Sequence, residues 1–149
     1  MKNDDRIILL DLNYTLVANS YALGSPFFNR LHLEEYRTEL VEAIRDRDVV
    51  LITVRPIAFR DATLARIEER PRWRPQEAWF NDNGLRAPEC KQHLLKTYVM
   101  PQHGSDPSGY FAIESNVETR KMYGDLGIKA KHVRALQLDH CEGCGALAL

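Results

Sequence analysis

Four residues whose side chains suit phosphoryl chemistry stand at comparable places in the sequence. Asp11, Thr53 and Glu114 each lie at the carboxyl end of a short apolar run, and Lys91 lies near the start of a predicted helix. Ligands of open α/β sheets bind at the carboxyl ends of the strands, so we expect these side chains at one edge. Mg²⁺ binds one or two carboxylates together with waters and phosphate oxygens, and a lysine neutralises the charge of a phosphoryl group. The pattern therefore indicates a site for a phosphate and a divalent cation.

The elements that must position these residues alternate along the chain. Apolar runs predict strands at 6–10, 48–53, 77–80, 110–113 and 131–136. Helical spacing and Pro or Gly boundaries predict helices at 33–45, 56–71, 88–100 and 118–126. Strands that alternate with helices favour right-handed crossovers. We therefore predict an α/β, Rossmann-like three-layer sandwich with a mostly parallel five-stranded sheet.

Length and composition limit the classes of protein that are compatible with the chain. Its 149 residues suffice for one domain, and 44% hydrophobic with 28% charged residues indicates a globular rather than a disordered protein. A net charge of −1 gives no overall attraction to nucleic acid or to an anionic membrane. No apolar run reaches the ~20 residues that span a bilayer, and no signal peptide precedes the first strand. We expect a cytoplasmic protein without membrane binding, with a domain at 1–138 and a tail at 139–149.

The order and spacing of Asp11, Thr53, Lys91 and Glu114 resemble the four motifs of the haloacid dehalogenase (HAD) superfamily. Residues 51–137 are most similar to the phosphatase domain of phage polynucleotide kinase. The similarity includes the arginine after Thr53, the Trp-Phe pair after residue 78, and the segment at 116–128. The resemblance implies a HAD-like fold and phosphatase or phosphotransferase chemistry through a phosphoaspartate.

The resemblance also implies a role for each site residue. Asp11 would attack phosphorus and bind Mg²⁺, while Glu114 and the backbone carbonyl of Asn13 would complete the metal ligands. Thr53 would bind a phosphoryl oxygen, and Lys91 would neutralise the charge shared by nucleophile and phosphate. The implied catalytic set is Asp11, Asn13, Thr53 and Lys91, the substrate-binding set is Thr53, Arg55 and Lys91, and the metal set is Asp11, Asn13 and Glu114. For Arg55 a salt bridge at the loop is the alternative to a substrate phosphate.

Two positions depart from the HAD pattern. Asn13 stands where HAD phosphatases have the aspartate that protonates the leaving group and later activates water. An amide does not transfer protons at neutral pH, and the loss of general acid–base help costs ~10²–10⁴-fold in rate. Ser115 stands where the polynucleotide kinase phosphatase has the second of two aspartates, so one anion is lost. Glu118 either replaces that anion or is an exposed acid at a helix N-terminus.

Three functions remain open on these residues. The first is a Mg²⁺-dependent phosphatase with another proton carrier. The candidate carriers are Glu118, His32, His93 and His103. The second is a phosphotransferase or slow hydrolase with a persistent phosphoaspartate, and the third is a catalytically impaired pseudoenzyme that binds a phosphorylated ligand or a partner. The retained charged residues favour catalysis, because a pure scaffold has no need of them.

The segment after the first motif bears on the substrate. About seventeen residues, 16–32, separate it from the next predicted helix, which is room for a flap but not for a cap domain. An open site suits a large substrate or a second subunit that acts as a lid, so we expect a nucleotide or nucleic-acid-end phosphate and consider a homodimer. Arg66, Arg70, Arg72 and Arg74 surround Trp73, either as a contact for a phosphate backbone or as a solvated helix end.

The tail contains half of a zinc site. Cys141 and Cys144 form a C-x-x-C pair beside His140, and a structural zinc site needs four ligands. His132, Cys90 or a partner chain would complete it. A redox pair and a plain tail are the alternatives.

Overall fold

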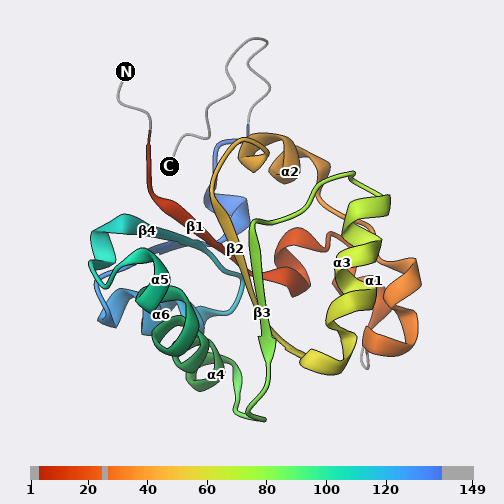
Figure 1. Ribbon diagram of the computed structural model, residues 1–149. Helices are drawn as coiled ribbons and strands as arrows, with labels where there is room; N and C mark the ends of the chain where they lie inside the picture. The colour runs from red at the N-terminus through yellow and green to blue at the C-terminus, as the bar shows by residue number, and fades with distance from the viewer. Residues whose placement is uncertain (1–3, 25–26, 139–149) are drawn as a thin grey trace.

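A computed structural model describes residues 4–24 and 27–138 of the chain. Five parallel strands form one sheet in the order β3-β2-β1-β4-β5, which confirms the predicted α/β architecture (Figure 1). The strands are β1 (Ile7–Leu10), β2 (Val49–Pro56), β3 (Glu77–Asn81), β4 (Tyr110–Ile113) and β5 (Lys129–Lys131). Because β1 is the central strand, the residue after it lies in the middle of the carboxyl edge.

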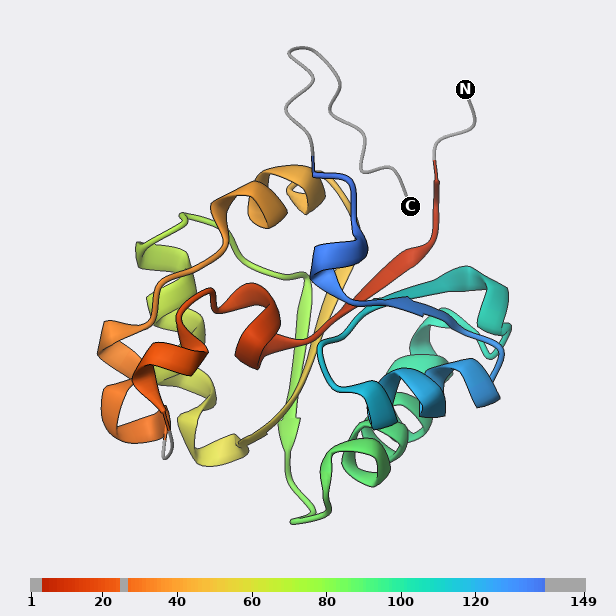
Figure 2. The ribbon, with the colours of Figure 1, turned by 180° about the vertical axis from the view of Figure 1, so that it is seen from behind.

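Helices cover both faces of the sheet, as Figure 1 and the reverse view in Figure 2 show. One face carries α1 (Ser20–Leu23), α2 (Thr38–Ile44) and α3 (Arg60–Glu69). The other carries α4 (Ala87–Leu94), α5 (Met100–His103) and α6 (Val117–Asp125). None of the helices in the described part of the chain combines the length and apolar character needed to cross a membrane.

The continuous apolar runs of the central strands supply two cores. Ile8 and Leu10 belong to the cluster that includes Ile44 of α2, whereas Leu9 belongs to the cluster with Leu94 of α4. This alternation results from the two-residue period of a strand, which places successive side chains on opposite faces. A strand covered on both faces therefore reads as uniformly apolar.

The fifth strand was predicted at 131–136, but it occupies Lys129–Lys131. Gly127 comes after α6 with φ of +88°, and the buried Ile128 leads directly into the strand. Val133–Ala135 instead forms a helical turn, in which the His132 imidazole accepts a hydrogen bond from the Arg134 backbone N–H. The apolar residues after 132 therefore fill the core from a turn.

The helix predicted at 33–45 is also shorter than expected. It begins at Thr38, and the preceding helical turn Phe27–Leu33 is separate from it. Tyr36 is extended and forms an antiparallel bridge with Val17, so it ties the segment after β1 to the domain. Only short helical turns lie between β1 and α2 in the described residues, in agreement with a flap rather than a cap.

Candidate functional site

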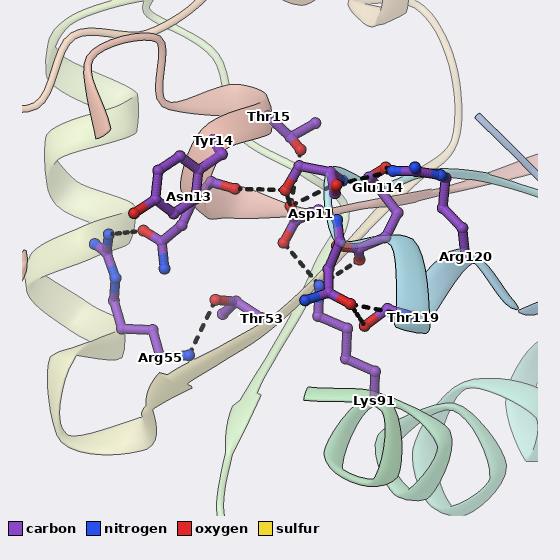
Figure 3. Close-up of polar contacts among 12 residues, drawn as sticks. Asp11, Asn13, Tyr14, Thr15, Thr53, Arg55, Lys91, Glu114, Thr119 and Arg120 are labelled. Atoms are coloured by element: carbon purple, nitrogen blue, oxygen red, sulfur yellow. Dashed lines mark hydrogen bonds and ion pairs between the residues drawn. The ribbon is translucent and has the colours of Figure 1, made fainter. Parts of the chain in front are cut away.

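The strand register brings the predicted residues to one edge of the sheet. Leu10 of β1 pairs with Leu51 of β2 and with Ile113 of β4, so Asp11 and Glu114 come directly after paired residues. Thr53 lies on the other side of Asp11, in β2. Figure 3 shows these side chains together, with Lys91 reaching them from α4.

Lys91 forms ion pairs with both acidic side chains. Its Nζ lies 2.7 Å from Asp11 Oδ1 and 2.5 Å from Glu114 Oε2. All three residues are at most 7% exposed. We call Asp11, Lys91 and Glu114 the lysine cluster. It holds one cation between two carboxylates in a buried setting, where such interactions are strong.

The pKa values of the two carboxyl groups in the lysine cluster are shifted in opposite directions. Burial works to raise the pKa of Asp11, but the charge of Lys91 and hydrogen bonds from Lys91, Thr15 and Ser115 hold this pKa below its usual range. Burial raises the pKa of Glu114 to about 7, against the effect of Lys91 and with the help of the Asp11 charge. The pKa of Lys91 is raised: burial opposes its charge, but the two neighbouring carboxylates outweigh burial. Asp11 is therefore the more acidic of the two carboxyl groups, and its ionised form is the one that a nucleophile requires.

Hydroxyl groups fix the second oxygen of Asp11. Thr15 Oγ1 donates to Asp11 Oδ2 at 2.7 Å, and Ser115 Oγ donates to the same oxygen at 2.8 Å. Ser115 Oγ also lies 3.3 Å from the backbone oxygen of Asn13. Thr15 thus stabilises the loop and also orients the carboxylate.

The half-buried Asn13 side chain points away from Asp11 and joins a second cluster, whose other members are buried. Arg55 Nη2 donates to Asn13 Oδ1 at 2.8 Å and to Glu34 Oε2 at 2.5 Å. Arg55 Nη1 donates to Glu34 Oε1 and to Thr63 Oγ1, at 2.9 and 3.0 Å. We call Asn13, Glu34, Arg55 and Thr63 the arginine cluster. The salt bridge that was the alternative for Arg55 is therefore present, with Glu34 as its partner.

Thr53 is fully buried between these two clusters. Its hydroxyl oxygen accepts a hydrogen bond from the Arg55 backbone N–H at 3.1 Å. Because the oxygen accepts this bond, the hydroxyl proton is the group that Thr53 can offer to a ligand.

The loop after Asp11 has an unusual conformation. Tyr14 has φ of +63°, a value that non-glycine residues rarely adopt and that costs energy. Its N–H donates to Ser20 Oγ at 2.8 Å, and its ring packs edge-on against Tyr21 with centroids 4.6 Å apart. Tyr21 is 78% exposed, so the pair presents an aromatic surface beside Asn13.

The proton-carrier candidates lie on the surface or pair with other acids. His103 Nε2 lies 2.6 Å from Glu77 Oε1, and His93 Nε2 lies 3.9 Å from Asp82 Oδ1. His32 and Glu118 are exposed, the latter in the first turn of α6. The structure thus brings Asp11, Thr53, Lys91 and Glu114 together. None of the four proton-carrier candidates forms a hydrogen bond or ion pair with Asp11 in the described part of the chain.

Sequence reasoning did not single out three residues that shape the site. Arg120 Nη1 donates to the backbone oxygens of Glu114 and Ser115 at 2.9 and 2.8 Å, which fixes the chain after β4. Glu34 and Thr63 complete the arginine cluster. Arg120 comes four residues after the Asn116 helix cap and was recognisable as a helix-face residue. No sequence signal links Glu34 to Arg55, because the contact joins distant segments.

Two further predictions concern the basic–aromatic segment around Trp73 and the cysteine pair of the tail. Trp73 is 6% exposed and packs in the core with Leu64 and Ile67, so it is not available to stack on a nucleic acid. The zinc or redox prediction for Cys141 and Cys144 lies outside the described residues, as does the tail at 139–149. Cys90 is a buried free thiol.

The described residues offer a sparse set of donors for a divalent cation. No group of three or more His, Cys, Asp or Glu side chains suited to a metal occurs among residues 4–24 and 27–138. Glu114 Oε2 is bound to Lys91, and Glu114 Oε1 accepts from the Asn116 N–H at 3.1 Å. Asp11 Oδ2 and the Asn13 carbonyl converge on Ser115 instead. Both Glu114 oxygens are thus engaged by groups other than those that surround Asp11 Oδ2, and the implied role of Asp11, Asn13 and Glu114 as metal ligands stays a prediction.

Two solved structures share this fold at low sequence identity. A chain of the Pnkp1/Rnl/Hen1 complex matches with a TM-score of 0.68 and 16% identity over 86% of this chain. A chain of the Pnkp1/Rnl/Hen1 RNA repair complex matches with a TM-score of 0.67 and 16% identity, also over 86%. The present chain spans only 44% and 42% of the lengths of those two chains. No protein-family model and no curated protein matches the sequence.

Proposed function

We propose that this chain is a HAD-type phosphotransferase or slow phosphatase that acts on a nucleic-acid-end or nucleotide phosphate through Asp11. The observation that carries the proposal is the buried Asp11 carboxylate, whose pKa is held low although burial opposes its charge. It stands at the carboxyl edge of the central strand with Lys91 2.7 Å away. A buried carboxylate kept ionised beside a fixed cation is a candidate nucleophile.

The proposed reaction needs few groups. An Asp11 oxygen attacks phosphorus and forms an acyl phosphate, while the bond from phosphorus to the leaving oxygen breaks and that oxygen departs with the electron pair. Lys91 stays protonated and balances the negative charge, and the Thr53 hydroxyl donates to a phosphoryl oxygen. Mg²⁺ is the cofactor that the resemblance implied, but no step here depends on it.

Asn13 determines the fate of the acyl phosphate once it has formed. Its amide gives no proton to the leaving group and takes none from water. Leaving groups that are stable as anions should therefore react best, and hydrolysis of the acyl phosphate should be slower by ~10²–10⁴-fold than with a general base. A long-lived phosphoaspartate favours transfer to an acceptor or slow turnover.

The substrate class is proposed from two observations. The solved chains that share the fold belong to complexes described as Pnkp1/Rnl/Hen1, one of them an RNA repair complex. The exposed Tyr21 packs against the half-buried Tyr14 beside Asn13, and aromatic rings stack on bases without requiring a particular sequence. A terminal phosphate at Asp11 would place the adjoining base near this pair.

The test is a search for the covalent intermediate. The protein is incubated with p-nitrophenyl phosphate, with nucleoside monophosphates and with oligonucleotides that carry terminal phosphates, and its intact mass is measured. We expect an adduct of one phosphoryl group that forms with wild type, is lost in Asp11→Asn, and persists in the control Asp61→Asn, whose side chain is 97% exposed. Neither adduct nor phosphate release with any of these compounds would reject the proposal.

One observation favours a second function. The Asn13 amide oxygen accepts a hydrogen bond from Arg55 and is held away from Asp11, as expected of a site adapted to bind rather than hydrolyse. In that case the chain would bind phosphate-terminated oligonucleotides without forming an adduct, and Asp11→Asn would leave this affinity within about threefold of wild type, a change of less than one kcal/mol.

A further inference from the structure

Three oxygen atoms meet beside Asp11 at the carboxyl edge of the sheet. Ser115 Oγ lies 2.8 Å from Asp11 Oδ2 and 3.3 Å from the Asn13 backbone oxygen. Figure 3 shows Asp11 and Asn13 close together at this edge. Carboxylate and carbonyl oxygens are the ligands that Mg²⁺ and Ca²⁺ prefer. The Ser115 hydroxyl stands where these two oxygens converge and donates its proton toward them.

The backbone holds Ser115 in this place. Arg120 Nη1 donates to the Ser115 backbone oxygen at 2.8 Å and to the Glu114 backbone oxygen at 2.9 Å. The Ser115 N–H also points toward Asp11 Oδ2, at 3.5 Å. The hydroxyl is therefore fixed by the fold before any ligand arrives.

The charge at this point is too small for a tight cation site. Of the three converging oxygens only Asp11 Oδ2 is anionic, and Lys91 already neutralises part of its charge from 2.7 Å at the other oxygen. Glu114 is directed to Lys91 and to the Asn116 N–H, so it adds no oxygen here. Affinity for hard cations rises with the number of charged ligands.

We propose that the Ser115 hydroxyl takes the place of a divalent cation in the resting site. By hydrogen bonding it holds Asp11 Oδ2 and the Asn13 carbonyl together, and residue 115, rather than Glu114, decides whether the protein binds a metal. The inference rests on the proposed function only in that it concerns the same carboxylate. The protein alone then binds Mg²⁺ weakly, and the substitution Ser115→Asp, which adds a second carboxylate at the convergence point, creates a cation site.

The experiment measures cation binding directly, without turnover. Mg²⁺ is titrated calorimetrically, and Mn²⁺ by electron paramagnetic resonance, into wild type, Ser115→Asp and Glu114→Gln. Ser105→Asp is the matched control, since it adds the same charge to an exposed position in the loop after α5. Circular dichroism verifies that each variant is folded.

We expect weak binding by wild type, at least about tenfold tighter binding by Ser115→Asp, and no gain with Ser105→Asp. Glu114→Gln should leave the weak wild-type affinity unchanged. Micromolar Mg²⁺ binding by wild type, loss of such binding in Glu114→Gln, or a folded Ser115→Asp without a gain would each overturn the proposal. If Ser115→Asp does not fold, the Mg²⁺ affinity of wild type still tests the proposal, because micromolar binding would overturn it.

Adduct formation separates this inference from the proposed function. With wild type, a chelator should change the yield of phosphoaspartate from p-nitrophenyl phosphate by less than about twofold, because the hydroxyl already orients Asp11. Abolition of the adduct by the chelator would refute the cation substitution while it supported the nucleophile. Weak cation binding without any adduct would refute the nucleophile and leave the inference on Ser115 intact.

Discussion

The lysine cluster and the arginine cluster lie on opposite sides of Thr53 and balance their charges differently. Lys91 faces two carboxylates, Asp11 and Glu114, so this side contains more acid than base. Arg55 faces one carboxylate, Glu34, and its remaining hydrogen bonds go to neutral oxygens of Asn13 and Thr63.

The difference supports the proposal that the lysine cluster, and not the arginine cluster, is the reactive one. A buried ion pair of one cation and one carboxylate has little net charge left to offer a ligand. The lysine cluster has two carboxyl groups for one cation. Burial raises the pKa of Glu114, whereas Lys91 and the hydrogen bonds keep the pKa of Asp11 low. Chemistry is therefore expected on the side whose charges are unequal.

The largest expected effect comes from the residue that lies between the clusters. Asn13→Asp would supply a carboxylate, and hydrolysis of the phosphoaspartate should accelerate by ~10²–10⁴-fold. Because Arg55 Nη2 lies 2.8 Å from Asn13 Oδ1, the new carboxylate should be held ionised and act as a base more than as an acid. Adduct lifetime measured after removal of the phosphodonor tests this. An unchanged lifetime would show that Asn13 is not at the proton-transfer position.

Removal of the shared cation should have the greatest effect on stability. Lys91→Met leaves two buried carboxyl groups without the cation that they share, which should cost about 3–5 kcal/mol of the free energy of unfolding and abolish the adduct. Urea unfolding at neutral pH measures the loss. Lys121→Met is the control, since Lys121 is a surface lysine with 77% of its side chain exposed, and it should change stability by less than about 1 kcal/mol.

A substitution in the arginine cluster should lower the free energy of unfolding without lowering the yield of the phosphoaspartate adduct. Glu34→Gln leaves the buried Arg55 charge unpaired but keeps its bonds to Thr63 and Asn13, so we expect a loss of about 3 kcal/mol. Urea unfolding and adduct yield are measured on the same preparation. If the adduct disappears while the protein remains folded, Arg55 takes part in substrate binding. The arginine cluster would then not be purely structural.

The smallest effect is a pH dependence confined to the lysine cluster. The folded-state pKa of Glu114, about 7, lies above the ordinary value of 4.5, so its contribution to stability is complete below pH 4.5 and is lost as the pH rises through 7. Across that window it amounts to about 3 kcal/mol spread over the pH range, because one pKa unit corresponds to about 1.4 kcal/mol. Glu114→Gln should remove this part of the slope, as measured by urea midpoints at several pH values. An equal slope in both proteins would mean that the pKa of Glu114 is not raised in the folded state.

The sequence predicted those parts of the fold and site that depend on local patterns. The strands at β1, β2, β3 and β4 are short apolar runs, and the polar residues after them were expected at the same edge. β5 was misplaced because its residues, Lys129–Lys131, carry two lysines, whereas the apolar residues after it belong to a turn.

The direction of side chains was the part that local patterns did not contain. Whether Glu114 faces a cation or Lys91, and whether Asn13 faces Asp11 or Arg55, depends on partners 23 and 42 residues away. Glu34 carries no motif, and its pairing with Arg55 results from the extended course of the chain around Tyr36. These choices arise from packing between distant segments.

The strand order also governs when the site is completed during folding. β1 is the central strand, yet its neighbour β4 comes about a hundred residues later, and Ser115 is 104 residues from the Asp11 carboxylate that it binds. Contacts of such sequence separation close slowly, because the loop entropy is lost before the contact forms. A nascent chain that ends before β4 therefore exposes one edge of β1 and an Asp11 that lacks its hydroxyl partner. Ordering of Asp11 should accordingly be among the last events of folding, and its pairing would report that the whole sheet has closed.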